Sequence, residues 1–171
     1  MIRLLLLRHA EAVAHAAGGD SERPLAETGC REAAKIAAYL AKKELLPTLS
    51  LVSTSLRTRE TFEIIARAFG KKLAVDFQAS LYNGGARALQ AALGQAPAST
   101  QTLLIIGHNP GLAEFASSLT RDGDSEGLAR MRHRFPTAGL AVIDFSQTTW
   151  SEASQGHGRL KRFVTPASLS S

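Results

Sequence analysis

Two short runs of aliphatic residues in this chain contain no polar position. Residues 4–7 are four leucines, and residues 103–106 read Leu-Leu-Ile-Ile. A continuous apolar run of this length, bounded by polar or turn residues, is typical of a strand buried on both faces of a parallel sheet. The sequence therefore predicts two central strands, over residues 2–8 and 102–107.

Helical and extended patterns alternate along the rest of the chain. Further helices are predicted over residues 29–43, 55–69, 86–93 and 109–120, and further strands over 49–53, 73–77, 139–145 and 159–164. Asn109 is expected to cap its helix with Pro110 in the first turn, and the last strand is expected at a sheet edge. Residues 10–28 and 121–136 are predicted as loops. The alternation predicts an α/β fold, a three-layer sandwich whose mostly parallel central sheet has helices on both faces.

Length and composition narrow the class of protein. The 171 residues suit a single domain spanning 1–171. A net charge of +5 favours anionic ligands such as phosphates, acidic proteins or nucleic acid. The single cysteine, Cys30, excludes an internal disulfide and fits a reducing compartment. The apolar run before Arg8 is too short for a signal peptide, and no stretch approaches the ~20 apolar residues of a membrane span, so we expect a cytoplasmic protein without a membrane partner.

Two histidines directly follow the predicted central strands. His9 comes after the first strand, beside Arg8, and His108 comes after the strand over 102–107. Ser53 ends another predicted strand, and Arg57 stands in the first turn of the helix after it. Ligands of open α/β sheets bind at the carboxyl ends of the strands, and guanidinium groups and helix N-termini both favour phosphoryl oxygens. The sequence therefore predicts a phosphoryl-binding site at this edge.

Imidazoles at such a site suit phosphoryl transfer. A neutral imidazole is nucleophilic near pH 7, and a second, protonated one can neutralise charge on the transferring group. The opposing interpretation, that His9 and His108 bind a metal ion, is disfavoured because Arg8 and Arg57 would repel the cation. We therefore expect neither a metal nor another cofactor.

Four segments, in order, resemble motifs of the histidine phosphatase superfamily (phosphoglycerate mutase-like), and within it the short phosphohistidine phosphatases of the SixA type. Residues 8–10, Arg-His-Ala, resemble the Arg-His-Gly motif that carries the nucleophile, and 107–110, Gly-His-Asn-Pro, resemble the second-histidine motif. Residues 53–61 and 23–25 resemble two further segments that supply arginines. The resemblance implies a phosphoglycerate mutase-like fold and a metal-independent phosphatase that works through a phosphohistidine intermediate.

The resemblance also assigns roles to individual residues. It implies that His9 is the nucleophile and that the phosphate pocket is formed by Arg8, Arg57, His108 and, as a fourth member, Arg23. We expect Ser53 and Asn109 to contribute to phosphate or substrate binding. Ala10 departs from the motif by one methyl group, which is tolerated where φ is negative.

A missing carboxylate bears on the substrate. The mutase-like members carry a general acid after the third strand, but residues 77–94 contain no Asp or Glu. The nearest possible substitutes are Asp20 and Glu11. An imidazole leaving group accepts a proton more readily than an alkoxide, so we expect a phosphorylated protein, dephosphorylated at histidine, as substrate and inorganic phosphate as product.

Two alternatives remain open at this point. One is a small-molecule phosphomonoesterase of the same superfamily, which would take a small phosphorylated substrate. The other is a non-catalytic phosphate-binding adaptor, which would have no need of a nucleophile. The basic segment 130–134 is not accompanied by a recognised nucleic-acid motif, so no nucleic acid is expected as a partner.

Overall fold

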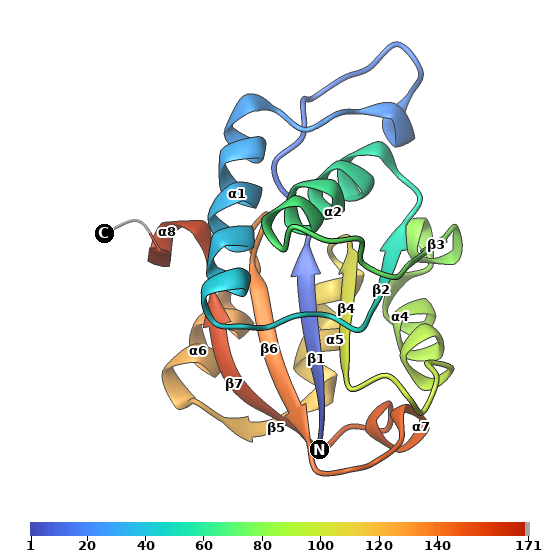
Figure 1. The fold of residues 1–171 in the computed structure, drawn as a ribbon, viewed down its shortest axis with the longest axis vertical. Helices are drawn as coiled ribbons and strands as arrows, with labels where there is room; N and C mark the ends of the chain where they lie inside the picture. Colours follow the sequence, from blue (N-terminus) through green and yellow to red (C-terminus); the bar gives the residue numbers. More distant parts are fainter. Residues whose placement is uncertain (170–171) are drawn as a thin grey trace.

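A computed structural model describes residues 1–169, which form a seven-stranded sheet covered by helices on both faces (Figure 1). The strand order is β3-β2-β4-β1-β6-β7-β5. The strands are β1 (Ile2–Arg8), β2 (Leu49–Ser53), β3 (Val75–Gln78), β4 (Thr102–Gly107), β5 (Thr120–Gly123), β6 (Leu140–Phe145) and β7 (Gly158–Val164). Only β6 runs against the others within the described residues, because it pairs antiparallel with both β1 and β7. The predicted mostly parallel sheet is confirmed.

Helices complete the outer layers of the predicted three-layer α/β sandwich. They are α1 (Glu27–Lys42), α2 (Leu56–Ala68), α3 (Ser80–Asn83), α4 (Gly85–Gly94), α5 (Gly111–Leu119), α6 (Ser125–His133), α7 (Trp150–Ala153) and α8 (Pro166–Leu169), with a 3-10 turn, η1, over Asp20–Glu22. The apolar side chains of α1, α2 and α8 pack on one face of the sheet, and those of α4 to α7 pack on the other. None of these helices, over residues 1–169, is long and apolar enough to cross a membrane.

The two all-apolar runs occupy the centre of the sheet, as predicted. Along β1, Leu4 and Leu6 face the layer that holds α4 to α7, while Leu5 and Leu7 face α1 and α2. All four side chains are fully buried. Burying a leucine stabilises the fold by roughly 1.5–3 kcal/mol, so a strand between two helical layers needs an apolar side chain at every position.

Three sequence predictions about the C-terminal half are wrong in detail. The expected edge strand, β7, lies between β6 and β5, and β5 itself is the edge. The expected loop over 121–136 contains most of β5 and all of α6. Helix α5 begins at Gly111, so Pro110 rather than Asn109 is the residue that precedes its first turn. Strand β5 and helix α6 lack a strong side-chain pattern: β5 pairs through its backbone, and α6 buries only Gly127, Leu128 and Met131.

The long segment between β1 and α1 is held close to the strand ends. The Ala10 amide donates to Thr61 Oγ1 of α2 at 3.1 Å. Gly29 lets α1 approach the backbone here, because a Cβ at this position would lie 1.9 Å from the Glu11 carbonyl oxygen. Ala10, which stands where the resembled motif has glycine, has a negative φ, and its methyl group is fully buried. The segment that carries Asp20 and Arg23 is therefore fixed above the carboxyl edge of the sheet.

Candidate active site

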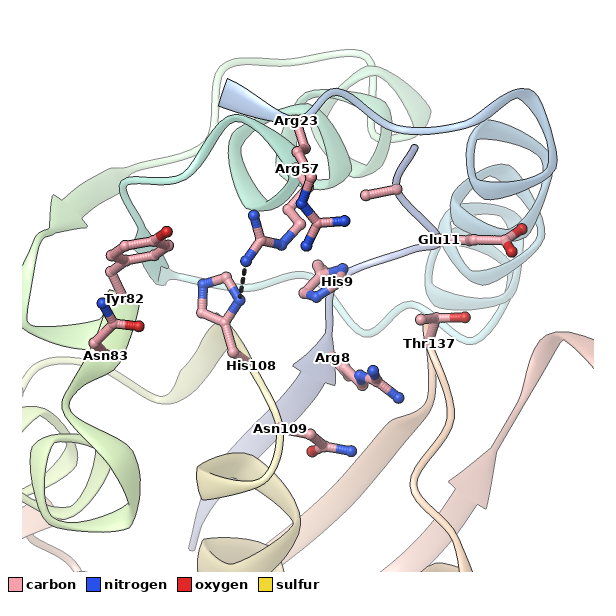
Figure 2. Close-up of a pocket in the computed structure, with 11 residues that line it drawn as sticks. Arg8, His9, Glu11, Arg23, Arg57, Tyr82, Asn83, His108, Asn109 and Thr137 are labelled. Atoms are coloured by element: carbon pink, nitrogen blue, oxygen red, sulfur yellow. Dashed lines mark hydrogen bonds between the residues drawn. The ribbon is translucent and has the colours of Figure 1, made fainter. Parts of the chain in front are cut away.

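Strand register places the two histidines side by side. Strands β1 and β4 are parallel neighbours in which Arg8 pairs with Gly107. His9 directly follows Arg8, and His108 directly follows Gly107. Their ring centroids lie 5.2 Å apart, and Figure 2 shows both rings at the centre of one pocket. The juxtaposition expected from the strand ends is thus present in the structure.

The pocket around these rings has a volume of about 340 Å³. It is lined by Arg8, His9, Glu11, Ala12, Arg23, Arg57, Tyr82, Asn83, His108, Asn109 and Thr137. Of the nine residues predicted for the site, only Ser53 and Asp20 do not line it. Both of these contact residues that do, since Ser53 bonds to His108 and Asp20 bonds to Arg57.

The hydrogen bonds of His9 define its reactive nitrogen. Its Nδ1 lies 2.7 Å from the carbonyl oxygen of Ala10. A carbonyl can only accept, so Nδ1 carries the proton and Nε2 keeps its lone pair. Burial is the main cause that lowers the pKa of His9 to about 3, and nearby His108, Arg57 and Arg8 lower it further, while the hydrogen bond to Ala10 acts in the opposite direction. At neutral pH His9 is therefore a neutral imidazole whose Nε2 lone pair is available to attack phosphorus.

The neighbouring His108 has the opposite tautomer. A terminal N–H of Arg57 donates to its Nδ1 at 3.4 Å, which leaves the proton on Nε2. That Nε2 lies 2.8 Å from Ser53 Oγ and donates to it. Burial, followed by the charge of Arg57, lowers the pKa of His108 to about 4. The imidazolium expected from the sequence is therefore absent from the free pocket, because burial and the arginines that attract phosphate both oppose protonation of the ring.

An arriving anion reverses this balance, and the first prediction follows from it. A dianion in the pocket offsets the arginine charges and raises the pKa of His108. We expect sulfate, whose own charge is constant in this range, to bind with proton uptake near pH 6, and its affinity to rise as the pH falls from 7 toward 5. Calorimetric titrations in two buffers of different ionisation enthalpy measure the protons taken up. A His108→Gln variant should lose most of the uptake, and sulfate binding without proton transfer would contradict the coupling.

Two guanidinium groups border the histidines, that of the buried Arg57 and that of the half-buried Arg8. Arg57 is only 6% exposed, and its terminal nitrogens donate to the Asp20 carbonyl oxygen at 2.9 Å and to Asp20 Oδ2 at 3.1 Å. A terminal nitrogen of Arg8 donates to the Phe135 carbonyl oxygen at 3.1 Å. The Nε atoms of both arginines are buried and lack a hydrogen-bond partner among residues 1–169. Unsatisfied buried N–H groups are costly, so an anion that reaches them gains strong hydrogen bonds.

Asp20 forms hydrogen bonds to two of the predicted arginines, Arg23 and Arg57. Its carboxylate accepts from Arg57, from Arg23 Nε at 2.9 Å, and from the hydroxyl of Tyr82. The Tyr82 hydrogen bond, followed by those from the two arginines, lowers the pKa of Asp20 to about 2. Asp20 is consequently ionised at neutral pH in the free pocket and carries no proton to donate.

The remaining predicted residues have well-defined partners. Glu11 is exposed, accepts from the Thr28 hydroxyl, and extends away from both histidines in Figure 2. The Asn109 amide nitrogen donates to the Phe135 carbonyl oxygen at 2.8 Å, and its Oδ1 accepts from the Ala113 amide at 3.2 Å. Asn109 thus still bonds to the first turn of α5 while it lines the pocket.

Four pocket residues were missed from the sequence: Ala12, which directly follows Glu11 in the predicted loop, and three polar residues. Tyr82 and Asn83 come from α3, next to the Gly84-Gly85 pair, where the sequence indicated only a turn. Thr137 comes from the segment between α6 and β6 and is preceded by no pattern that points to a site. Among residues 1–169, no group of three or more His, Cys, Asp or Glu side chains is arranged to hold a metal ion.

Comparisons with known proteins agree with the fold and the pocket. The family model of the histidine phosphatase superfamily (branch 1) matches residues 4–83. A solved structure from Agrobacterium tumefaciens, provisionally named phosphohistidine phosphatase SixA, is 30% identical, with a TM-score of 0.81 over 96% of this chain and 98% of that chain. A second structure with the same provisional name, from Nakamurella multipartitia, is 28% identical, with a TM-score of 0.83 over 96% of each chain. A chloroplastic protein of Arabidopsis thaliana is 33% identical over 180 residues, which cover 97% of this chain and 78% of that protein.

The chain therefore belongs to the histidine phosphatase superfamily. Within that superfamily it is of the SixA type, and it is a phosphatase, a hydrolase that removes phosphoryl groups.

Proposed function

We propose that this phosphatase removes the phosphoryl group from phosphohistidine in proteins, through a phosphoenzyme formed on His9. One observation carries the proposal. The bond from His9 Nδ1 to the Ala10 carbonyl leaves Nε2 as the only nitrogen with a lone pair, and this ring lies in a pocket bordered by Arg8, Arg57 and His108. A binding module would not need such a nucleophile.

Two displacements at phosphorus make up the reaction. In the first, His9 Nε2 forms a bond to phosphorus, the bond from phosphorus to the substrate's imidazole nitrogen breaks, and that nitrogen takes up a proton. In the second, a water oxygen forms a bond to phosphorus and the bond from phosphorus to His9 Nε2 breaks. The water releases a proton to the solvent, and inorganic phosphate leaves. Arg8 and Arg57 stabilise the charge on the phosphoryl oxygens in both steps, and His108 does so once protonated.

The protonation chemistry of the pocket supports phosphohistidine as substrate. The segment 77–94 contributes Tyr82 and Asn83 to the pocket, and neither is a carboxylic acid. Asp20 is ionised, and Glu11 extends away. An alkyl ester needs a proton donor for its leaving oxygen, whereas an imidazole nitrogen accepts a proton readily from water. The names of the two SixA-type relatives point to the same substrate class.

A turnover panel tests the proposal and gives the second prediction. We expect kcat/KM to be highest on a phosphohistidine peptide, intermediate on p-nitrophenyl phosphate, whose leaving group needs little protonation, and lowest on alkyl and sugar phosphates. All assays contain EDTA, which should leave the rates unchanged. A preference for sugar phosphates would favour the small-molecule alternative. Activity that EDTA removes and a metal ion restores would contradict the metal-independent mechanism, and no turnover of any substrate would favour the adaptor.

Asp20→Asn separates two roles of this carboxylate within the same panel. If Asp20 orders Arg57, Arg23 and Tyr82, the substitution should lower kcat/KM by a similar factor on every substrate. A loss confined to alkyl esters would instead identify Asp20 as a general acid that becomes protonated in the complex.

A further inference from the structure

A second pocket adjoins the active site. Its volume is also about 340 Å³, and it shares Thr137 with the phosphate pocket. We call it the side pocket and define it by Glu32 of α1, Arg130 of α6, Arg134 and Thr137 of the segment that follows α6, and Phe163 of β7. The phosphatase reaction assigns no role to the side pocket, because neither histidine of the active site lines it.

The wall between the two pockets is fixed to the nucleophile's own strand. The Phe135 carbonyl oxygen accepts from Arg8 and from Asn109 on the active-site side. The amide of Ala138 donates to the carbonyl oxygens of Arg8 at 3.1 Å and His9 at 3.0 Å. The Thr137 hydroxyl, between them, donates to the Glu32 carboxylate at 3.2 and 3.3 Å. A ligand that extends from one pocket into the other therefore passes a wall that is hydrogen-bonded to the backbone of Arg8 and His9.

The side pocket carries unpaired positive charge. Arg130 and Arg134 are exposed, and within residues 1–169 neither forms an ion pair with a carboxylate. The guanidinium of Arg130 lies 5.4 Å from the centre of the Phe163 ring, a cation–π contact that restricts its position. After burial, the charge of Arg134 is the next cause that lowers the pKa of Arg8, so its field reaches the active site. The two arginines and Glu32 leave one net positive charge.

We propose that the side pocket binds an aspartate or glutamate side chain of the protein whose phosphohistidine occupies the active site. One net positive charge suits a carboxylate, which bears a single negative charge, better than a second phosphate. Guanidinium groups bind carboxylates in a planar, two-pronged geometry, and the Phe163 ring offers an apolar wall to the methylene groups of such a side chain. This inference rests on the proposed function and adds to it a preference for acidic sequence near the phosphohistidine.

The test uses two phosphohistidine peptides of equal length. In one, glutamates flank the phosphohistidine on both sides, and in the other these are glutamines. We expect the wild-type protein to turn over the acidic peptide with about tenfold higher kcat/KM, mainly through KM, which corresponds to about 1.4 kcal/mol. An Arg130→Ala, Arg134→Ala double variant should bring the ratio of the two peptides close to one. Its turnover of p-nitrophenyl phosphate reports whether the phosphate pocket still works.

A matched control removes the same charge elsewhere. Arg67→Ala with Arg121→Ala alters two exposed arginines, on α2 and β5, that do not line the side pocket, and it should keep the wild-type preference. Loss of the preference in this control would indicate a general charge effect and overturn the inference. Equal turnover of both peptides by the wild type would overturn the inference alone. Turnover of neither peptide, with p-nitrophenyl phosphate still hydrolysed, would overturn the proposed function and the inference with it.

Discussion

Replacing His9 by alanine is expected to lower kcat by at least about 10⁴-fold and to abolish the phosphoenzyme. His9 Nε2 is the nitrogen that can attack, because Nδ1 is committed to the Ala10 carbonyl. In the variant, which lacks this imidazole, the arginines should still bind phosphate, so KM should change far less than kcat. Rapid acid-free quenching of the wild type during turnover should trap phosphate on His9 that is labile in acid and stable in base, and the variant should trap none.

A second histidine provides the control for this experiment. His15 is exposed in the segment between β1 and α1, and His15→Ala should retain wild-type turnover and labelling. Thermal unfolding of both variants checks that the fold persists, since His9 is buried and its removal leaves a small cavity. A folded His9→Ala protein with undiminished turnover would end the assignment of this residue as nucleophile.

Arg57→Ala should have the next largest effect, lowering kcat/KM by about 10²- to 10³-fold. Its guanidinium is the one that contacts both Asp20 and His108, so the substitution removes a phosphate-binding charge and releases two neighbours at once. Arg57→Lys should recover only part of the loss, because an ammonium group cannot bond to Asp20, His108 and phosphate in one plane. Steady-state kinetics on p-nitrophenyl phosphate measures both effects.

Helix α2 offers a matched control for this arginine. Arg59 lies two residues further along the helix and is exposed, so Arg59→Ala should leave kcat/KM near the wild-type value. The midpoint of thermal unfolding should not fall much in Arg57→Ala, since the arginine is a buried charge whose removal also ends a desolvation cost. A large loss of stability with a modest loss of turnover would make Arg57 a structural residue instead.

The central part of the sheet could be predicted because each strand position there is buried. Leu4 to Leu7 and Leu103 to Ile106 must be apolar on both faces, and few other structures require such a run. The helices α1 and α2 were found within two residues of their ends, because each presents one apolar face to this sheet. Strong burial leaves a strong pattern in the sequence.

Elements held mainly by backbone hydrogen bonds left no such pattern. Strand β5 pairs with β7 through main-chain groups that every residue carries, and its sequence, Thr-Arg-Asp-Gly, has no alternation of apolar side chains. Helix α6 covers the sheet with little more than Leu128 and Met131, so its polar and basic residues resembled a loop. For the same reason the side pocket, which depends on where α6 ends, could not be expected.

The sequence by itself determined that two imidazoles and two arginines would meet at one edge of a parallel sheet, because residues that follow neighbouring strands share that edge. Only the tertiary structure decided their chemical states. The contact with the Ala10 carbonyl selects the attacking nitrogen of His9, and Arg57 with Ser53 selects the opposite tautomer of His108. Burial beside the arginines keeps both rings neutral in the free pocket. Tautomers and pKa values depend on distances of a few ångströms between segments far apart in the chain, and no local pattern of residues encodes those distances.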